Sequence, residues 1–310
     1  MTFSTSTVRP QTSPSWPRRA AARRPLTTFL VLSFSLAYTL ALVWGLAHHG
    51  VIPGGGLADA LHIAPDEVAG GAVLLALFPA ALFVTWASGG SEGVRTLLRR
   101  AFHWRVSPGW WLTVLLGLPT LTVGLAVLLG DDLRTIDASS VAVSQLTALV
   151  VNFVVINIWE ETAWTGVFQT RLEERHNWAV AAALTAIPFA AIHLPLQFFL
   201  DEPVTVASLA AAFAVYLVLG LLVRPLLAVF RRGTGDSLLL VALLHSVFNR
   251  TNNQNGIAAT LLEGDARQLT MLMAVVLLTG VTAVIVRSRL SRRYGATLAQ
   301  RAQSRRPRHR

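Results

Sequence analysis

Long apolar stretches recur along almost the whole chain of 310 residues. A helix that crosses a bilayer needs about 20 predominantly apolar residues, and these stretches reach or approach that length. They lie near residues 26–47, 68–87, 110–130, 141–172, 178–199, 206–230, 236–254 and 269–287. We therefore expect an all-α, multi-pass membrane helix bundle with about eight transmembrane helices.

Composition supports a membrane protein and excludes several kinds of chemistry. Apolar residues make up 53% of the chain and charged residues 14%, whereas a soluble domain usually carries about 25% charged residues. The absence of cysteine and lysine from the sequence excludes disulfides, thiolate metal sites, a cysteine nucleophile and a Schiff-base lysine. An all-arginine set of basic residues is typical of GC-rich coding, and we predict the plasma membrane of a bacterium as the location.

The arginines indicate how the spans are oriented. If the N-terminus is cytoplasmic and the spans alternate, 23 of the 26 arginines, Arg224 among them, fall on the cytoplasmic side. Only Arg134, Arg250 and Arg267 then lie outside. Because cytoplasmic loops carry an excess of arginine, this solution places both termini in the cytoplasm. The net charge of +10 therefore suits contact with an anionic membrane surface, and we expect no nucleic-acid partner.

Three regions follow from this pattern. Residues 1–25 predict a disordered basic cytoplasmic arm, rich in Ser, Thr, Pro and Arg. Residues 26–287 predict the transmembrane domain, and its polar motifs lie within residues 141–255. Residues 288–310 predict a basic cytoplasmic tail.

Three of the expected spans contain polar side chains that are costly inside a bilayer and are therefore functional candidates. They are Asn157, Glu160 and Glu161 in the fourth span, His193 and Gln197 in the fifth, and His245 and Asn249 in the seventh. The last two pairs are each four residues apart, which predicts one helix face for each pair. Counted along their helices, the three clusters fall at similar depths.

These residue types suit hydrolysis of an amide. A carboxylate can take a proton from water and deliver it to the leaving amine, while histidine and asparagine can donate to the oxyanion. Glutamate with two histidines is also a zinc-binding set, here Glu160, His193 and His245. No HExxH motif is present, so the ligands of such a zinc ion would come from three helices. The residues alone leave both chemistries open.

The same residues resemble the motifs of the CAAX protease and bacteriocin-processing family of intramembrane proteases. The family pattern is EExxxR, FxxxH and HxxxN in that order. Here EETAWT begins at Glu160, FAAIH ends at His193, and HSVFN runs from His245 to Asn249. The resemblance covers about residues 141–255. It implies an intramembrane endopeptidase that cuts a membrane-attached peptide or protein and requires no metal cofactor.

Carried over by position, the resemblance gives each residue a role. It implies that Glu160 activates water, that Glu161 is its partner, and that His193 positions the water. It implies that His245 and Asn249 form the pair that binds the oxyanion and the substrate.

One motif position departs from the family. Its arginine falls at Thr165, which can hydrogen-bond to Glu161 but cannot neutralise it, and Arg171 is too far along the helix to replace it. The departure puts activity in doubt. A catalytically inactive membrane scaffold or immunity protein therefore remains an alternative, as does a proton-coupled transporter that uses the same glutamates and histidines as a relay.

Overall fold

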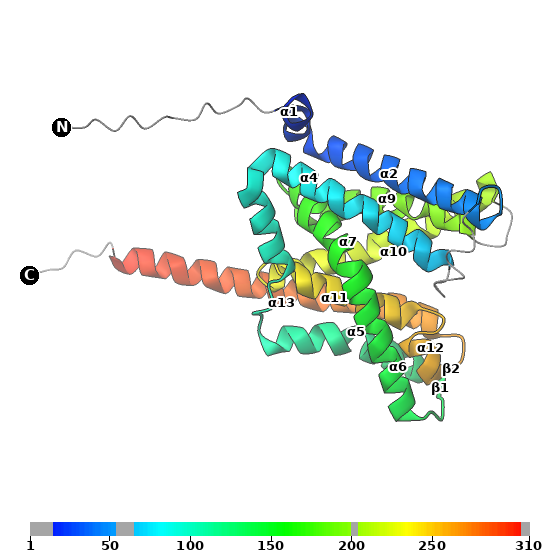
Figure 1. The fold of residues 1–310 in the computed structure, drawn as a ribbon. Helices are drawn as coiled ribbons and strands as arrows, with labels where there is room; N and C mark the ends of the chain where they lie inside the picture. The colour runs from blue at the N-terminus through cyan, green and yellow to red at the C-terminus, as the bar shows by residue number, and fades with distance from the viewer. Residues whose placement is uncertain (1–14, 54–64, 200–203, 305–310) are drawn as a thin grey trace, which may run out of the picture.

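The computed structural model describes residues 15–53, 65–199 and 204–304, and these fold almost entirely into helices (Figure 1). Short loops connect the helices, and the described residues also contain a two-residue antiparallel pair, β1 (Asp132–Leu133) with β2 (Leu262–Glu263). The helices are α1 (Trp16–Arg23), α2 (Pro25–His48), α4 (Pro65–Ala101), α5 (Pro108–Leu128), α6 (Ala138–Val151), α7 (Ile158–Ala163), α8 (Thr170–Leu172), α9 (Trp178–Ile192), α10 (Val206–Gly233), α11 (Leu238–Asn252), α12 (Ile257–Leu261) and α13 (Arg267–Ser304). The expected all-α, multi-pass bundle is confirmed.

Six described helices are long and apolar enough to cross a membrane. They are Pro25–His48, Pro108–Leu128, Ala138–Leu172, Trp178–Phe199, Val206–Gly233 and Arg267–Arg289. The other two expected spans correspond to α4 and α11, and α11 has only 15 residues, fewer than the roughly 20 that a crossing needs. The count of eight and the cytoplasmic placement of the termini stay predictions.

The arm and the tail both contain helix that the sequence analysis did not predict. Helix α1 lies inside the arm 1–25, where Pro17 suits a helix start and alanines favour the helix. The Arg18 guanidinium of α1 lies 4.5 Å from the ring centroid of Trp86. At the other end, α13 continues through residue 304 without a break at 288, and Figure 1 shows its last turns projecting from the bundle. Residues 1–14 and 305–310 lie outside the described residues.

Two apolar cores hold the bundle together. One joins α5, α10, α11 and α13, and includes Trp110, Phe230 and Leu244. The other joins α2, α4, α9 and the C-terminal half of the Ala138–Leu172 helix, and includes Phe29 and Trp164. Figure 1 shows that helix, labelled α6 and α7, crossing the bundle, and α7 contacts both α4 and α11. Polar side chains of α7 are therefore buried between the two cores.

Candidate active site

The glutamate pair lies on a helix whose winding changes on either side of it. Between α6 and α8, π-helical turns at Asn152–Asn157 and Trp164–Gln169 flank the α-helical turn α7, which carries Glu160 and Glu161. A π turn adds a residue to the helix turn and shifts the direction of the side chains around it. Both glutamates are buried, which is costly for a carboxylate unless partners compensate it.

Glu161 has a complete set of partners. Arg224 of α10 donates from Nη1 to Glu161 Oε2 at 2.9 Å and from Nη2 to Oε1 at 2.6 Å. Thr165 donates its hydroxyl to Oε2 at 2.5 Å, and His245 Nδ1 lies 2.7 Å from Oε1. Because the Arg224 fork holds Glu161 as a carboxylate, His245 Nδ1 is the donor in its contact. Both oxygens of Glu161 are thus occupied.

Arg224 corrects the sequence-based expectation in two ways. It was assigned to the cytoplasmic side, but its side chain is completely buried, with Cζ 4.4 Å from the ring centroid of Phe189. The glutamate pair was expected to lack a compensating cation, yet Arg224 supplies one from another helix. The available signal was an arginine inside the apolar run LLVRPLL, since a charge within a span is a functional candidate.

Glu160 is less fully bonded than its neighbour. Asn157 donates from Nδ2 to Glu160 Oε2 at 3.1 Å. His193 Nε2 lies 3.8 Å from Oε1, and His245 Nδ1 lies 3.8 Å from Oε2. Among the described residues, Glu160 Oε1 is a buried oxygen with no hydrogen-bond partner. This oxygen can therefore act as a base or as a ligand.

His193 stands at a break in its helix. Helix α9 ends at Ile192, His193 is its C-cap, and a 3₁₀ turn follows at Leu194–Phe199. His193 and Gln197 therefore do not share a face of one α-helix, contrary to the expectation from their spacing; Pro195 cannot donate the next helical hydrogen bond. The ring Nδ1 donates to the Phe189 carbonyl at 2.6 Å, which leaves Nε2 as the nitrogen that faces Glu160.

Among the described residues, Asn249 contacts other asparagines near the site. Its Nδ2 lies 3.4 Å from Asn157 Oδ1 and 3.5 Å from Asn152 Oδ1. Ser246, which the sequence analysis did not single out, donates to the same Asn157 oxygen at 2.9 Å. Asn157 therefore connects α11 with Glu160, whereas the contacts of Asn249 are with asparagines and not with the glutamates.

A zinc site can be tested against these contacts. The grouped donor atoms of Glu160, Glu161 and His245 lie within 4.8 Å of one another. Glu161 fits a metal poorly, because Arg224 occupies both of its oxygens and would repel a second cation. The set expected from the sequence is Glu160, His193 and His245. Glu160 has an unpaired oxygen, and both histidines make their ring hydrogen bonds through Nδ1, which leaves their Nε2 atoms as the nitrogens that could bind a metal. This set remains a hypothesis.

The segment that carries the three motifs also matches a known protein family. Residues 142–251 match the family model described as Type II CAAX prenyl endopeptidase Rce1-like. The match spans all three motifs and also Arg224, and it confirms the resemblance recognised from the motifs. No curated protein and no solved structure matches the chain.

Proposed function

We propose, on the premise that residues 142–251 belong to the Rce1-like family of CAAX-type membrane proteases, that this chain is an intramembrane endopeptidase in which Glu160 activates water. The substrate class is a membrane-attached peptide or protein. The family description names prenylated CAAX substrates, and a lipidated peptide is accordingly the first substrate to test.

The unequal bonding of the two glutamates is the observation that carries the proposal. Glu161 has four partner contacts from three side chains, and Arg224 compensates its charge. Glu160 has one hydrogen bond and a free oxygen that faces His193. We assign Glu160 to the chemistry and Glu161 to holding Arg224 and His245 in place.

The reaction follows from this assignment. A water molecule between Glu160 Oε1 and His193 Nε2 loses a proton to Glu160 as its oxygen attacks the carbonyl carbon. The carbonyl becomes an oxyanion, which His245 stabilises by a hydrogen bond from Nε2. Protonated Glu160 then returns the proton to the leaving nitrogen, and the C–N bond breaks.

Arg224 also bears on the inactive alternative. That alternative rests on the missing motif arginine at position 165. Because a guanidinium reaches the same glutamate from α10, the charge that the motif normally supplies is present, and Thr165 is left as an additional hydrogen-bond donor. This supports an enzyme over a scaffold.

The test compares cells that express the wild-type chain with cells that express Glu160→Gln. Mass spectrometry of peptide termini in isolated membranes should reveal cleavage products that are absent with Glu160→Gln, and a farnesylated CAAX peptide offered to the purified proteins serves as a defined probe. Glu263→Gln, at an exposed position in β2, is the matched control and should cleave normally. Wild-type cleavage by Glu160→Gln would contradict the proposal.

A further inference from the structure

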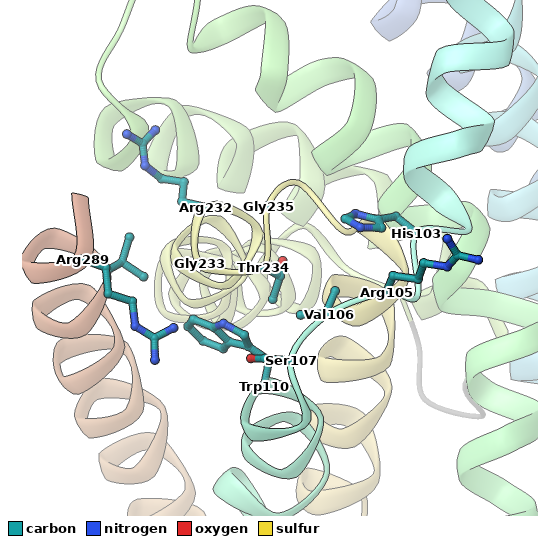
Figure 2. Close-up of a pocket in the computed structure, with 11 residues that line it drawn as sticks. His103, Arg105, Val106, Ser107, Trp110, Arg232, Gly233, Thr234, Gly235 and Arg289 are labelled. Atoms are coloured by element: carbon teal, nitrogen blue, oxygen red, sulfur yellow. The ribbon is translucent and has the colours of Figure 1, made fainter. Parts of the chain in front are cut away.

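A basic cavity lies outside the glutamate site, where three helices reach one end of the bundle. It has a volume of about 460 Å³, and its lining includes Arg105, Trp110, Arg232 and Arg289. Figure 2 shows Arg289 of α13 directed toward Trp110 of α5, with His103 and Arg105 on the other side of the cavity. The lining residues that the structure describes include three arginines and no carboxylic acid.

The aromatic ring of Trp110 forms one wall of the cavity and is held by its neighbours. The ring of Trp110 packs edge-on against Phe230, with 5.2 Å between centroids, and the guanidinium of Arg289 lies 5.7 Å from the Trp110 centroid. Gly233 at the end of α10 makes this possible, because a Cβ there would collide with the Trp110 ring. The cation of Arg289 is thus positioned by an aromatic face.

The arginines of the cavity are not neutralised equally. Arg232 lies 3.6 Å from the Glu173 carboxylate. The described contacts of Arg105 and Arg289 are with tryptophan rings, Trp104 and Trp110 respectively. These two guanidinium groups therefore keep their hydrogen-bond donors available for an anion, and the fork geometry of arginine suits the oxygens of a phosphate.

Position distinguishes a lipid from a soluble anion. Pro108 begins one candidate span, and Gly233 and Arg289 end two others, so the cavity lies at the level where a bilayer meets water. On the two helices that supply Trp110 and Arg289, Leu112 of α5 and Val284 and Ile285 of α13 are exposed apolar side chains. Acyl chains can cover this surface while a phosphate occupies the basic cavity.

We propose that this cavity binds the phosphate headgroup of an anionic phospholipid. It is the cytoplasmic end of the bundle in the predicted orientation, where anionic lipids attract arginine. The proposal is independent of the peptidase chemistry, because none of the residues that line the cavity belongs to the glutamate site.

Native mass spectrometry of the purified full-length chain, with lipid titrated into detergent, provides the test. Phosphatidylglycerol should bind more tightly than phosphatidylcholine. Each of Arg105→Gln and Arg289→Gln should weaken phosphatidylglycerol binding about fivefold, and the double variant about 25-fold. Arg289→Lys should retain part of the affinity, whereas Arg23→Gln, an exposed arginine of α1, should bind as the wild type does.

Two outcomes would overturn the proposal. The first is equal binding of the two lipids by the wild type, or unchanged phosphatidylglycerol binding by a double variant that elutes and melts as the wild type does. The second is displacement of the lipid by equimolar inorganic phosphate, which would identify a soluble-phosphate site. Failure of phosphate to compete supports the lipid.

Discussion

Arg224 and Glu161 form a two-point ion pair between α10 and α7, with both side chains at 0% exposure. The pair joins segments that are 63 residues apart in sequence. It fixes the carboxylate that in turn bonds His245, and so connects three helices at the centre of the candidate active site. Changes to this pair should therefore alter both the stability of the fold and the rate of cleavage.

Removal of Arg224 alone should be strongly destabilising. Arg224→Gln leaves the Glu161 carboxylate buried without its cation, which typically costs about 3–5 kcal/mol. Thermal unfolding in detergent should show a large fall in Tm, and Arg95→Gln, an exposed arginine paired with Glu92, serves as the control. Arg224→Gln combined with Glu161→Gln should recover much of the loss, because no unpaired charge remains. A double variant less stable than Arg224→Gln would contradict this account.

The site should accept its cation from either of two positions, but not from both. Thr165→Arg in the wild-type background places a second guanidinium in a fully buried position beside Arg224, and should lower stability and cleavage through repulsion and overpacking. Thr165→Arg with Arg224→Ala restores one cation, four residues from Glu161. This double variant should be more stable and more active than Arg224→Ala. Equal losses in the two would show that the location of the cation matters as well as its charge.

The contacts of Asn249 predict that it acts through Asn157. Asn249→Ala and Asn157→Ala should each slow cleavage, and the double variant should be about as slow as Asn157→Ala alone, because the two residues form one connected unit. If Asn249 instead donates directly to the oxyanion, its loss should cost about 100- to 1000-fold and should multiply with the loss of Asn157. Measurement of kcat/KM for the four proteins of this cycle separates the roles.

Zinc should be dispensable. Because Glu160 itself is proposed as the base, and because Arg224 occupies both oxygens of Glu161, we expect protein that has been dialysed against a chelator to cleave at the undialysed rate. Elemental analysis of the same samples provides the control for metal content. Stoichiometric zinc that is lost together with cleavage, and that Glu160→Gln or His193→Ala fails to bind, would instead establish the three-ligand site.

Much of the architecture could be predicted from hydropathy, because an apolar run of about 20 residues has few alternatives to a spanning helix. Six of the expected runs reappear as candidate spans with shifts of a few residues. The helix at residues 16–23 and the continuation of α13 past residue 288 were not predicted, because the polar arm was interpreted as disordered and the polar tail was assigned no helix. Helix formation there depends on local propensity, which hydropathy does not measure.

The candidate site was predictable in its members but not in its connections. Glu160, Glu161, His193 and His245 meet as their depths suggest, since a polar side chain inside a bundle must find polar partners. The partners themselves depend on helix rotation, and the two π turns and the break after Ile192 alter that rotation in ways that a fixed helical period misses. Arg224 was overlooked because orientation counting treats every arginine near a span end as a loop residue.

The distance in sequence between the two members of the buried pair has a consequence for how the chain is made. An arginine four residues from Glu161 would enter the bilayer together with it, whereas Arg224 leaves the ribosome 63 residues later. The helix of α7 must therefore be inserted, or held at the translocon, with an uncompensated acid at a cost of about 3 kcal/mol until α10 arrives. A chain truncated before α10 is accordingly expected to be degraded, although it contains the complete glutamate motif.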